Sequence, residues 1–346
     1  MARSALDRYW YVVAESRELK ADSVLARRLH DESLALYRDA TGTAIVAQDR
    51  CLHRCSRLSS GMVEAGKLRC RYHGWVYGEG GKVIHIPSDG EGETPRLKAK
   101  TYRSVEQDGY IYACLAPDAE TPATPFVLPR PEGDRWRHIR LQNVFANSIA
   151  NCAENYIDVP HTSFVHKGIF RNPAGHPIDL DLVRQSAHIK IIYNGETLNL
   201  GYFSRLLNPS GGLIEHVDNF HAPNITSVHY RLPNGFSYFI TSQCVARSEG
   251  DTLVYTDISY DFGLWSSGPF DLITRWVVRD QAQRVINQDI SILNEQGETI
   301  RQYGETFYNT TADAIHVEIH DMINRLERGE KLGGGQDMSR RLRIFV

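Results

Sequence analysis

Long hydrophobic runs are absent from this sequence of 346 residues. Nowhere do about eighteen apolar residues follow one another, which is the length that a transmembrane helix needs. The first twenty residues also contain no apolar run typical of a secretory signal. These absences exclude a membrane-spanning helix in this sequence, and we expect a cytoplasmic protein.

A strong charge of either sign is absent as well. The net charge of −3 gives no electrostatic attraction to nucleic acid or to an anionic membrane, so neither is an expected partner. Cysteine is scarce, with six residues in a chain that we expect to lie in a reducing compartment. Thiols in such a chain favour metal ligands and buried side chains over a disulfide framework. They are Cys51, Cys55, Cys70, Cys114, Cys152 and Cys244.

Glycine-rich nucleotide motifs are the third absence. The stretches "GEGGK" and "GGGQ" do not join a strand to a helix in the pattern that binds a dinucleotide, so no nicotinamide or flavin site is expected. A plant-type ferredoxin run of cysteines is also missing. Any electrons that this chain uses must therefore come from another protein.

Short strands dominate the first third of the chain. Two alternating apolar runs flank a turn at 39–42, and "GGKVIHI" and "DGYIYACL" each follow a turn that contains glycine. Residues 116–134 then hold five of the fourteen prolines, without a hydrophobic period. We predict an all-β domain at 1–118, a linker at 119–134 and a second domain at 135–346.

The second domain mixes helices and strands. The pattern predicts a helix at 143–159 and strands in "AHIKIIYNGETLNLGYF", where Asn194-Gly195 is typical of a tight hairpin turn. Further strands are expected in "FSYFITSQCVAR" and "TLVYTDISY". Residues 270–296 and 312–328 return to helical periodicity. The predicted fold class is therefore α+β.

Two pairs of ligand-type residues lie in "CLHRCSRLSSGMVEAGKLRCRYHGW", at 51–75. Cys51 and His53 form the first pair, and Cys70 and His73 form the second. Two thiolates with two imidazoles suit either a tetrahedral zinc ion or a [2Fe–2S] cluster in which histidines bind one iron. Zinc fingers group cysteine with cysteine, whereas each pair here mixes sulfur with nitrogen. The spacing therefore favours the cluster.

This stretch resembles the Rieske iron-sulfur family, in which Cys-x-His is followed by Cys-x-x-His, with Gly and Trp closing the second loop. All six positions match, at Cys51, His53, Cys70, His73, Gly74 and Trp75. Cys55 departs from the pattern, because loops of this type more often have Gly there. The second loop offers no cysteine to pair with it, so we expect a buried or half-exposed free thiol and a cluster of lower potential.

A second constellation lies in "NCAENYIDVPHTSFVHKGIF", at 151–170. Asp158 and His161 are three residues apart on one predicted helical face. The carboxylate can therefore accept a hydrogen bond from the imidazole nitrogen that a metal leaves free. His166 would point elsewhere on an unbroken helix, and Pro160 gives a reason for the helix to bend or end between the histidines. Two imidazoles with one carboxylate would suit non-heme Fe(II) with positions open for oxygen.

Asp289 is the predicted carboxylate. It lies on the apolar stripe of its helix, where a buried charge needs a metal or a cationic partner. The rival Asp280 points away from this stripe and has Arg284 four residues on, as in a surface ion pair. The predicted metal ligands are therefore His161, His166 and Asp289.

The second domain is similar to the terminal oxygenase components of Rieske non-heme iron oxygenases. Their motif Glu-Asn-x-x-Asp-x-x-His-x-x-x-x-His is matched from Glu154 to His166. The resemblance implies an antiparallel, helix-grip-like sheet packed on helices and a catalytic role for Asn155 and Asp158. It also implies a homotrimer in which Asp158 bridges His161 of its own subunit and His73 of the adjacent one.

The resemblance further implies an O2-dependent monooxygenation. Electrons from NAD(P)H would arrive through a separate reductase, with or without a ferredoxin, and pass from the [2Fe–2S] cluster to the mononuclear Fe(II). The compact chain is similar to oxygenases that hydroxylate or demethylate small aromatic or heterocyclic molecules. A ring-dihydroxylating dioxygenase, a Rieske electron carrier and a zinc hydrolase are the alternatives.

Two further signals carry less weight. The stretch "HVEIH" at 316–320 has two histidines at metal-ligand spacing. It lies on an amphipathic helix, and we interpret the two histidines as part of its solvent-exposed side. The stretch "NTT" at 309–311 fits a glycosylation acceptor, which has no meaning without a secretory signal.

Overall fold

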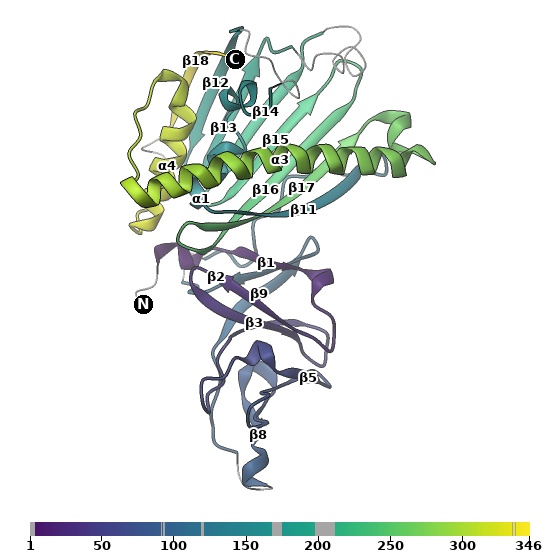
Figure 1. Cartoon of the computed structure of the whole chain (residues 1–346), viewed down its shortest axis with the longest axis vertical. Helices are drawn as coiled ribbons and strands as arrows, with labels where there is room; N and C mark the ends of the chain where they lie inside the picture. Colours follow the sequence, from purple (N-terminus) through teal and green to yellow (C-terminus); the bar gives the residue numbers. More distant parts are fainter. Residues whose placement is uncertain are drawn as a thin grey trace. The chain divides into compact units, whose positions relative to one another are not determined.

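The computed structural model describes residues 4–90, 92, 94–118, 121–167, 175–197, 212–333, 335 and 337–346. The chain divides into two compact units, residues 1–127 and 128–346, which Figure 1 colours along the sequence. Within the described ranges, none of the helices combines the length and the apolar character that crossing a membrane requires.

The first unit contains a six-stranded antiparallel sheet in the order β1-β10-β9-β4-β3-β2. The turn predicted at 39–42 is confirmed, because the strands on either side of it pair in register, with Ala35 opposite Ala47. The strands are β1 (Tyr11–Glu15), β2 (Val24–Leu29), β3 (Glu32–Arg38), β4 (Ala44–Gln48), β9 (Thr101–Gln107) and β10 (Tyr110–Cys114).

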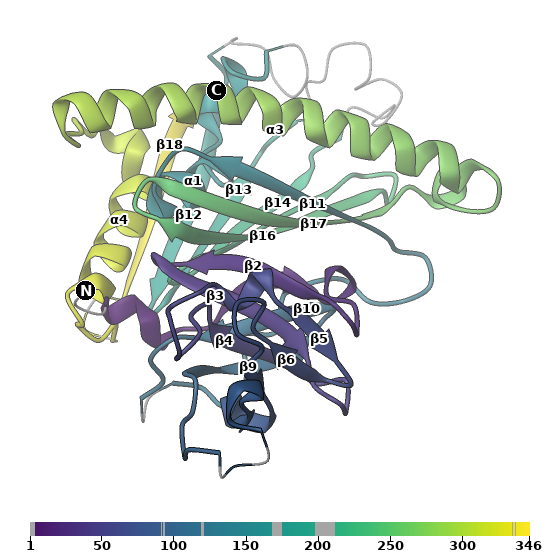
Figure 2. The ribbon, with the colours of Figure 1, turned by 60° about the horizontal axis from the view of Figure 1, so that its bottom comes forward.

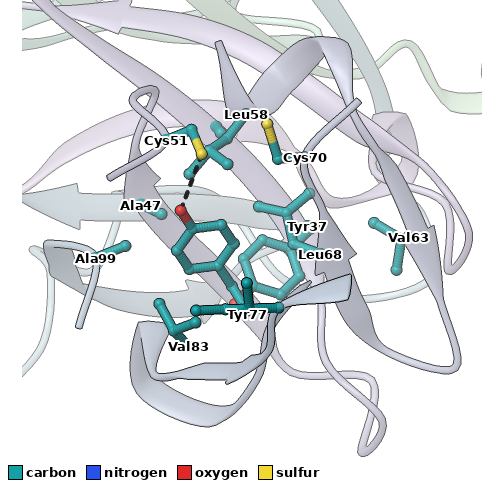
Figure 3. Packing of buried hydrophobic residues seen from close by; sticks show 12 residues of the cluster. Tyr37, Ala47, Cys51, Leu58, Val63, Leu68, Cys70, Tyr77, Val83 and Ala99 are labelled. Atoms are coloured by element: carbon teal, nitrogen blue, oxygen red, sulfur yellow. Dashed lines mark hydrogen bonds between the residues drawn. The ribbon is translucent and has the colours of Figure 1, made fainter. Parts of the chain in front are cut away.

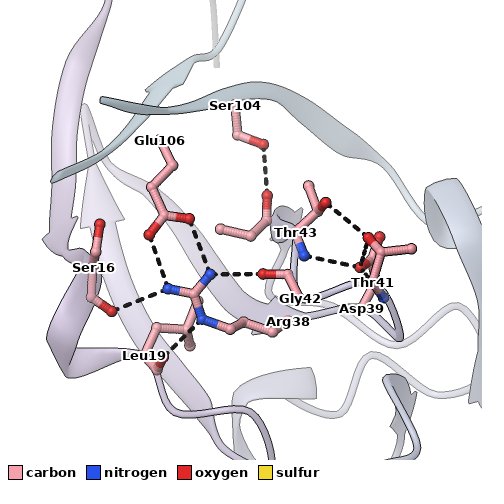
Figure 4. Close-up of polar contacts among 10 residues, drawn as sticks. Ser16, Leu19, Arg38, Asp39, Thr41, Gly42, Thr43, Ser104 and Glu106 are labelled. Carbon is pink, nitrogen blue, oxygen red and sulfur yellow. Dashed lines mark hydrogen bonds and ion pairs between the residues drawn. The ribbon is translucent and has the colours of Figure 1, made fainter. Parts of the chain in front are cut away.

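Arg38, the last residue of β3, forms hydrogen bonds to strand β9 and to the segment between β1 and β2 (Figure 4). Its two terminal nitrogens donate to both carboxylate oxygens of Glu106 on β9, each at 3.0 Å. The same guanidinium donates to the carbonyls of Leu19 and Ser16, at 2.9 and 3.1 Å. A planar, bidentate arrangement of this kind suits arginine and not lysine.

A smaller four-stranded antiparallel sheet in the order β5-β6-β7-β8 completes the first unit. It consists of β5 (Met62–Glu64), β6 (Lys67–Arg69), β7 (Val76–Tyr77) and β8 (Val83–His85). Buried side chains from its strands and loops, among them Leu58, Leu68, Tyr77 and Val83, form one apolar cluster (Figure 3). The loop at 70–75 joins β6 to β7, so this sheet positions the second predicted ligand pair.

The second unit is built on an eight-stranded antiparallel sheet in the order β11-β17-β16-β15-β14-β13-β12-β18. Its strands are β11 (Arg137–Phe145), β12 (Pro177–Gln185), β13 (His188–Asn194), β14 (Glu215–His221), β15 (Ile225–Arg231), β16 (Ser237–Ser248), β17 (Asp251–Asp261) and β18 (Met338–Phe345). The two strands predicted in 236–260 are confirmed as β16 and β17, and the α+β fold class is confirmed with them.

Among the described residues, three α-helices accompany this sheet: α1 (Ile149–Asn155), α3 (Phe270–Tyr303) and α4 (Ala314–Glu327). Figures 1 and 2 both show α3 running across one face of the sheet, with α4 beside the edge formed by β12 and β18. The predicted helices at 270–296 and 312–328 are therefore confirmed. The buried residues of α3 lie on one stripe, namely Val278, Ile286, Asp289, Leu293 and Gly297.

One prediction about the second unit is confirmed only in part, and another is wrong. The helix expected at 143–159 is a strand as far as Phe145, and α1 covers only Ile149–Asn155. The tight turn at Asn194-Gly195 does not form, because the Ile214 amide still donates to the Glu196 carbonyl at 3.0 Å. Thr197 also bridges Leu213, and residues 198–203 of the expected second arm lie outside the described residues.

Candidate metal centres

Two loops of matching backbone geometry carry the four predicted cluster ligands. The Cys55 amide donates to the Cys51 carbonyl at 3.0 Å, and the Gly74 amide donates to the Cys70 carbonyl at 3.1 Å. In each loop the amide of the first cysteine also donates to the carbonyl five residues on, at 2.8 and 2.9 Å. Both loops thus form the same turn and present a cysteine at its first position.

The fifth residue of each loop has a left-handed backbone conformation. The φ angle is +56° at Cys55 and +71° at Gly74. Glycine adopts such angles without strain, whereas a side chain makes them unfavourable, which explains the glycine of the family pattern. The Cys55 thiol is free, as predicted, but it is exposed and not buried, and its sulfur accepts a hydrogen bond from Arg50 Nε at 3.3 Å.

The two ligand sulfurs lie inside the apolar cluster of the small sheet (Figure 3). The Tyr77 hydroxyl lies 3.1 Å from Cys51 Sγ and accepts a hydrogen bond from the Leu52 amide at 3.0 Å, so it is oriented to donate to the sulfur. Burial raises the pKa of the Cys51 thiol. A thiolate at this position therefore needs a positive partner such as iron.

The two imidazoles lie on the more exposed side of the loops. The rings of His53 and His73 are 4.5 Å apart between centroids, and His53 stacks on Trp75 at 4.9 Å. His73 is exposed, whereas His53 Nδ1 is buried and, among the described residues, lacks a hydrogen-bond partner. Two buried sulfurs and two imidazoles from paired loops fit a [2Fe–2S] cluster with one histidine-bound iron.

The predicted iron ligands His161, His166 and Asp289 converge in the second unit. His166 Nε2 lies 3.0 Å from Asp289 Oδ1, and His161 Nε2 lies 3.5 Å from the same oxygen. The two Nε2 atoms are 3.3 Å apart. One ligand atom from each residue therefore faces a common point, although the residues are up to 128 positions apart in the sequence.

The remaining imidazole nitrogens have partners that point the Nε2 atoms toward this common point. His161 Nδ1 lies 3.1 Å from Asp158 Oδ2, and His166 Nδ1 lies 2.8 Å from Gln288 Oε1. Asp289 Oδ1 is buried and, within the described chain, accepts no hydrogen bond of good geometry. An unsatisfied carboxylate oxygen that faces two Nε2 atoms fits a mononuclear metal ion.

Electrostatics at this site favour a cation. Burial lowers the pKa of His161, but the carboxylates of Asp158 and Asp289 outweigh that effect and raise it to about 9. Burial alone would raise the pKa of Asp289, yet the neighbouring imidazoles hold it below its ordinary value. The site thus stabilises positive charge beside Asp289, and a metal ion would replace protons there.

The local backbone differs from the one predicted for these residues. Helix α1 ends at Asn155, before Pro160, and His161 lies in a short 3-10 helix over Pro160–Ser163. Asp158 and His161 therefore do not share a helical face. They meet because Asp158 Oδ2 also accepts from the His161 amide, at 3.3 Å, at the start of that turn. The predicted carboxylate–imidazole contact is present, but the 3-10 turn and not an α-helical face produces it.

Asn155 and Asp280 were also considered from the sequence, and neither belongs to the metal-facing triad. Asn155 is the last residue of α1, and within the described chain its side chain makes no hydrogen bond to the metal-facing residues. Asp280 forms the expected surface ion pair, with its Oδ2 at 2.8 Å from Arg284 Nε. Gln288 is a positioning residue that the sequence reasoning missed, although its place beside Asp289 on α3 was a usable signal.

The interpretation that the histidines of "HVEIH" lie on the solvent-exposed side of their helix is wrong. The side chains of His316 and His320 are 9% and 13% exposed, and both face Glu154 of α1. The physical reason is that α4 packs this face against α1 and not against water. Sequence reasoning missed the cluster because Glu154 precedes His316 by 162 positions.

A second buried charged group was also missed. His216 on β14 has Glu196 Oε2 at 2.6 Å from Nδ1 and Asp218 Oδ1 at 2.9 Å from Nε2. Its ring stacks between those of Tyr193 and Tyr230. Burial lowers the pKa of His216, but the two carboxylates outweigh burial and raise it to about 9.

The fold and the two donor sets define an iron-sulfur protein with a separate mononuclear metal site. Residues 9–103 match the Rieske [2Fe-2S] domain, and residues 145–329 match the Vanillate O-demethylase oxygenase C-terminal domain. The second match alone covers more than half of the chain. The chain therefore belongs to the Rieske non-heme iron oxygenases, as a terminal oxygenase component.

Individual relatives agree with this family. The 4beta-methylsterol monooxygenase of Methylococcus capsulatus is 32% identical over 191 residues, which are 54% of this chain and 51% of that protein. The oxygenase component of dicamba O-demethylase from Stenotrophomonas maltophilia is 27% identical over 186 residues, or 53% and 54% of the two chains. The chain thus spans about half the length of these curated relatives.

Solved structures share the fold over nearly the whole chain. The Pseudomonas putida protein NdmA with caffeine has a TM-score of 0.79 at 17% identity, covering 97% of both chains. Dicamba monooxygenase bound to dicamba has a TM-score of 0.78 at 20% identity, covering 94% of this chain and 98% of the other. An electron carrier would need no mononuclear site, so the triad in this fold argues against that alternative.

Proposed function

We propose that this protein is a terminal oxygenase that uses O2 and externally supplied electrons to hydroxylate or oxidatively demethylate a small aromatic or heterocyclic molecule. The observation that carries the proposal is the convergence of His161 Nε2, His166 Nε2 and the unsatisfied Asp289 Oδ1. Two imidazoles and a carboxylate on one side of a metal leave other coordination positions open.

The residues of the chain have separate tasks in this proposal. His161, His166 and Asp289 hold Fe(II), which when bound supplies oxygen activation by one-electron steps. Asp158 and Gln288 hold the imidazoles in the tautomer that leaves Nε2 free for the metal. Cys51, His53, Cys70 and His73 hold the cluster that receives the electrons, and Asn155 takes the catalytic role that the family motif implies.

Asp158 links the two centres across a subunit boundary in this proposal. Its Oδ2 is used by His161 of the same chain, while the side chain remains 31% exposed. The exposed carboxylate can accept a hydrogen bond from the exposed His73 of an adjacent subunit. A homotrimer is consistent with the apolar side chains exposed in the first turns of α3 and in the short 3-10 helix before it, namely Leu264, Trp265, Phe270, Leu272, Ile273 and Trp276.

The substrate class follows from the reactions that the relatives' names state. One is a monooxygenase of a 4β-methylsterol and another an O-demethylase of dicamba, so both names concern a compound that carries a methyl group. We infer that the substrate presents a methyl or methoxy carbon to the iron. A reductase, with or without a ferredoxin, supplies the electrons. A cytoplasmic location stays a prediction, because some matched relatives are chloroplastic proteins.

Iron counting and coupled turnover test the proposal together. We expect three irons per chain, of which mild chelation removes one and leaves the visible spectrum of the cluster. NADH- and reductase-coupled oxygen uptake is then measured with methoxylated aromatics, N-methyl heterocycles and methylsterols. Formaldehyde or a hydroxymethyl product supports the proposal, and a cis-diol would favour the dioxygenase alternative.

The matched control is Asp289→Ala, which should retain two irons and the cluster spectrum but form no product. Product formation at the wild-type rate by this variant would contradict the assignment of Asp289. A purified protein without iron and without visible colour would revive the zinc hydrolase alternative. Analytical ultracentrifugation tests the trimer, and a monomer at micromolar concentration would contradict it.

A further inference from the structure

Three ligand-type side chains meet where α1 packs against α4, apart from the iron triad. Glu154 lies near the end of α1, and His316 and His320 lie one turn apart on α4. His316 Nδ1 is 2.7 Å and His320 Nε2 is 3.4 Å from Glu154 Oε2. One ligand atom from each of the three lies within 4.8 Å of the others.

A hydrogen-bonded ion pair does not satisfy this cluster. The contact between Glu154 and His316 uses Oε2, but His320 Nε2 is buried and, in the described part of the chain, makes no hydrogen bond. A buried ring nitrogen without a partner is unfavourable, because it loses its hydrogen bonds to water and gains none within the protein. A cation shared by the three side chains would satisfy this nitrogen and the carboxylate at the same time.

The donor set and its spacing suit a small divalent cation. Two imidazoles and a carboxylate form a common zinc ligand set, with a fourth position open for water. Tetrahedral bonds of about 2.1 Å place ligand atoms about 3.4 Å apart. The distance between His320 Nε2 and Glu154 Oε2 already has this value, whereas the 2.7 Å contact between His316 Nδ1 and Glu154 Oε2 must open.

The surroundings of the cluster are also those of a built site. The Phe307 ring makes T-shaped contacts with the rings of both histidines, with centroid distances of 4.8 and 5.6 Å. The two imidazoles are themselves 4.1 Å apart between centroids. An aromatic cover of this kind limits access of water and strengthens the binding of an ion.

We propose that Glu154, His316 and His320 form a second metal site, which binds a divalent cation of the Zn²⁺ type. The ion would clamp α1 onto α4 at the residue just before Asn155. Its role is therefore to stabilise the segment that leads to the iron ligands, without contact with the substrate. The proposal does not depend on the reaction that the iron centre catalyses.

The test uses the full chain with its cluster intact and with the iron triad disabled by His161→Ala. After treatment with a chelator, this variant is dialysed against micromolar ZnCl2, and bound metal is measured by mass spectrometry. We expect one Zn²⁺ per chain and a rise of several degrees in Tm. Adding His320→Ala should weaken Zn²⁺ binding at least tenfold and abolish the rise.

Two further variants separate the loss of a metal ligand from the loss of the fold. His320→Gln and Glu154→Gln, each added to His161→Ala, remove a ligand with little change in size, and they replace His320→Ala if that variant does not fold. His176→Ala, at an exposed histidine of the same unit, should leave Zn²⁺ binding unchanged. No bound Zn²⁺ in the His161→Ala protein, or unchanged affinity in both ligand variants, would show an ion pair only and overturn the proposal.

Discussion

At the scale of single residues, both metal centres depend on side chains that do not bind metal themselves. Asp158 and Gln288 each use one oxygen to hold the Nδ1 side of an imidazole. The Tyr77 hydroxyl is placed in the same way, against the Cys51 sulfur. Substitutions at such residues separate the positioning of a ligand from the ligand itself.

Asp158→Asn is expected to keep both metals and to lose turnover. The amide oxygen can still accept from His161 Nδ1, so the histidine keeps its orientation, but the negative charge on the proposed electron path is lost. Coupled product formation should fall about 10- to 100-fold, the range found when the partner of a metal ligand is substituted. Metal analysis should still give three irons per chain. Loss of the mononuclear iron would instead show that Asp158 is needed to hold the site together.

Tyr77→Phe is expected to lower the reduction potential of the cluster. The hydroxyl lies 3.1 Å from Cys51 Sγ, and a hydrogen bond to sulfur stabilises the reduced state. Such a bond contributes about 0.5–1.5 kcal/mol, which corresponds to roughly 20–60 mV for one electron. Spectroelectrochemical titration measures the shift. Tyr112→Phe, at another buried tyrosine of the same unit, is the control, and an equal shift there would contradict the assigned cause.

The residues that could be predicted from the sequence are those whose chemistry is local or anomalous. The two Cys and His pairs are close in sequence, and Asp289 stood out as a charge on an apolar stripe. Glu154 with His316 and Glu196 with His216 could not be predicted, because each pair exists only through contacts between separate elements. The backbone conformation at Cys55 could not be predicted either. Only the structure shows that this cysteine adopts a left-handed φ angle, which glycine adopts without strain.

At the scale of elements, α3 positions Asp289 through a close contact two turns further on. A Cβ atom added at Gly297 would lie 2.0 Å from the Ala146 carbonyl oxygen, so the helix touches the segment between β11 and α1. The Asn147 side chain donates to the Leu293 carbonyl at 2.8 Å in the same contact. The strand end, the start of α1 and the helix that bears Asp289 are therefore fixed together.

Gly297→Ala should destabilise the second unit and weaken iron binding. The new methyl group must displace a backbone carbonyl, and overpacking of this kind costs about 1–3 kcal/mol. We expect a lower urea midpoint and a lower iron content per chain, with the cluster spectrum unchanged. Ser291→Ala, on the exposed face of α3, serves as the control and should change stability by less than about 0.5 kcal/mol. Wild-type stability and iron content in Gly297→Ala would contradict this close contact.

The errors at the scale of elements have a physical cause. Phe145, Ile149 and Cys152 are spaced as on one helical face, yet the first of them belongs to a strand that pairs with β17 as far as Phe145. The Ser148 side chain then accepts from the Asn151 amide at 3.2 Å and starts α1. Pairing with a distant strand overrode the local period. The long helices were predictable because their apolar stripes extend over several turns.

At the scale of the whole molecule, stability should depend on pH through His216. This imidazole is fully buried between Glu196 and Asp218, and it stacks between Tyr193 and Tyr230. Its folded pKa of about 9 lies above the value of about 6.5 in an unfolded chain. The folded state therefore holds a proton that the unfolded state releases over this interval.

The free energy of unfolding should be highest below about pH 6.5 and should fall as the pH rises through 9. The slope has an upper limit of about 1.4 kcal/mol per pH unit for one proton. Urea midpoints measured from pH 6 to 9.5 on the metal-loaded protein check this expectation. In Asp218→Asn the loss should end at lower pH and be smaller in total, because one carboxylate that raises the folded pKa is gone. A midpoint that is constant or rises across this range would contradict the role of His216.

The exposed thiol of Cys55 allows a chemical probe to be attached beside the predicted cluster site. All six cysteines lie in the described part of the chain, and Cys55 is the exposed one among them. A maleimide reagent should therefore label a single position, four residues after a cluster ligand. The rate of labelling then reports which partner proteins cover this surface, and a spin label or fluorophore placed there would measure the approach of the proposed reductase without altering a predicted ligand.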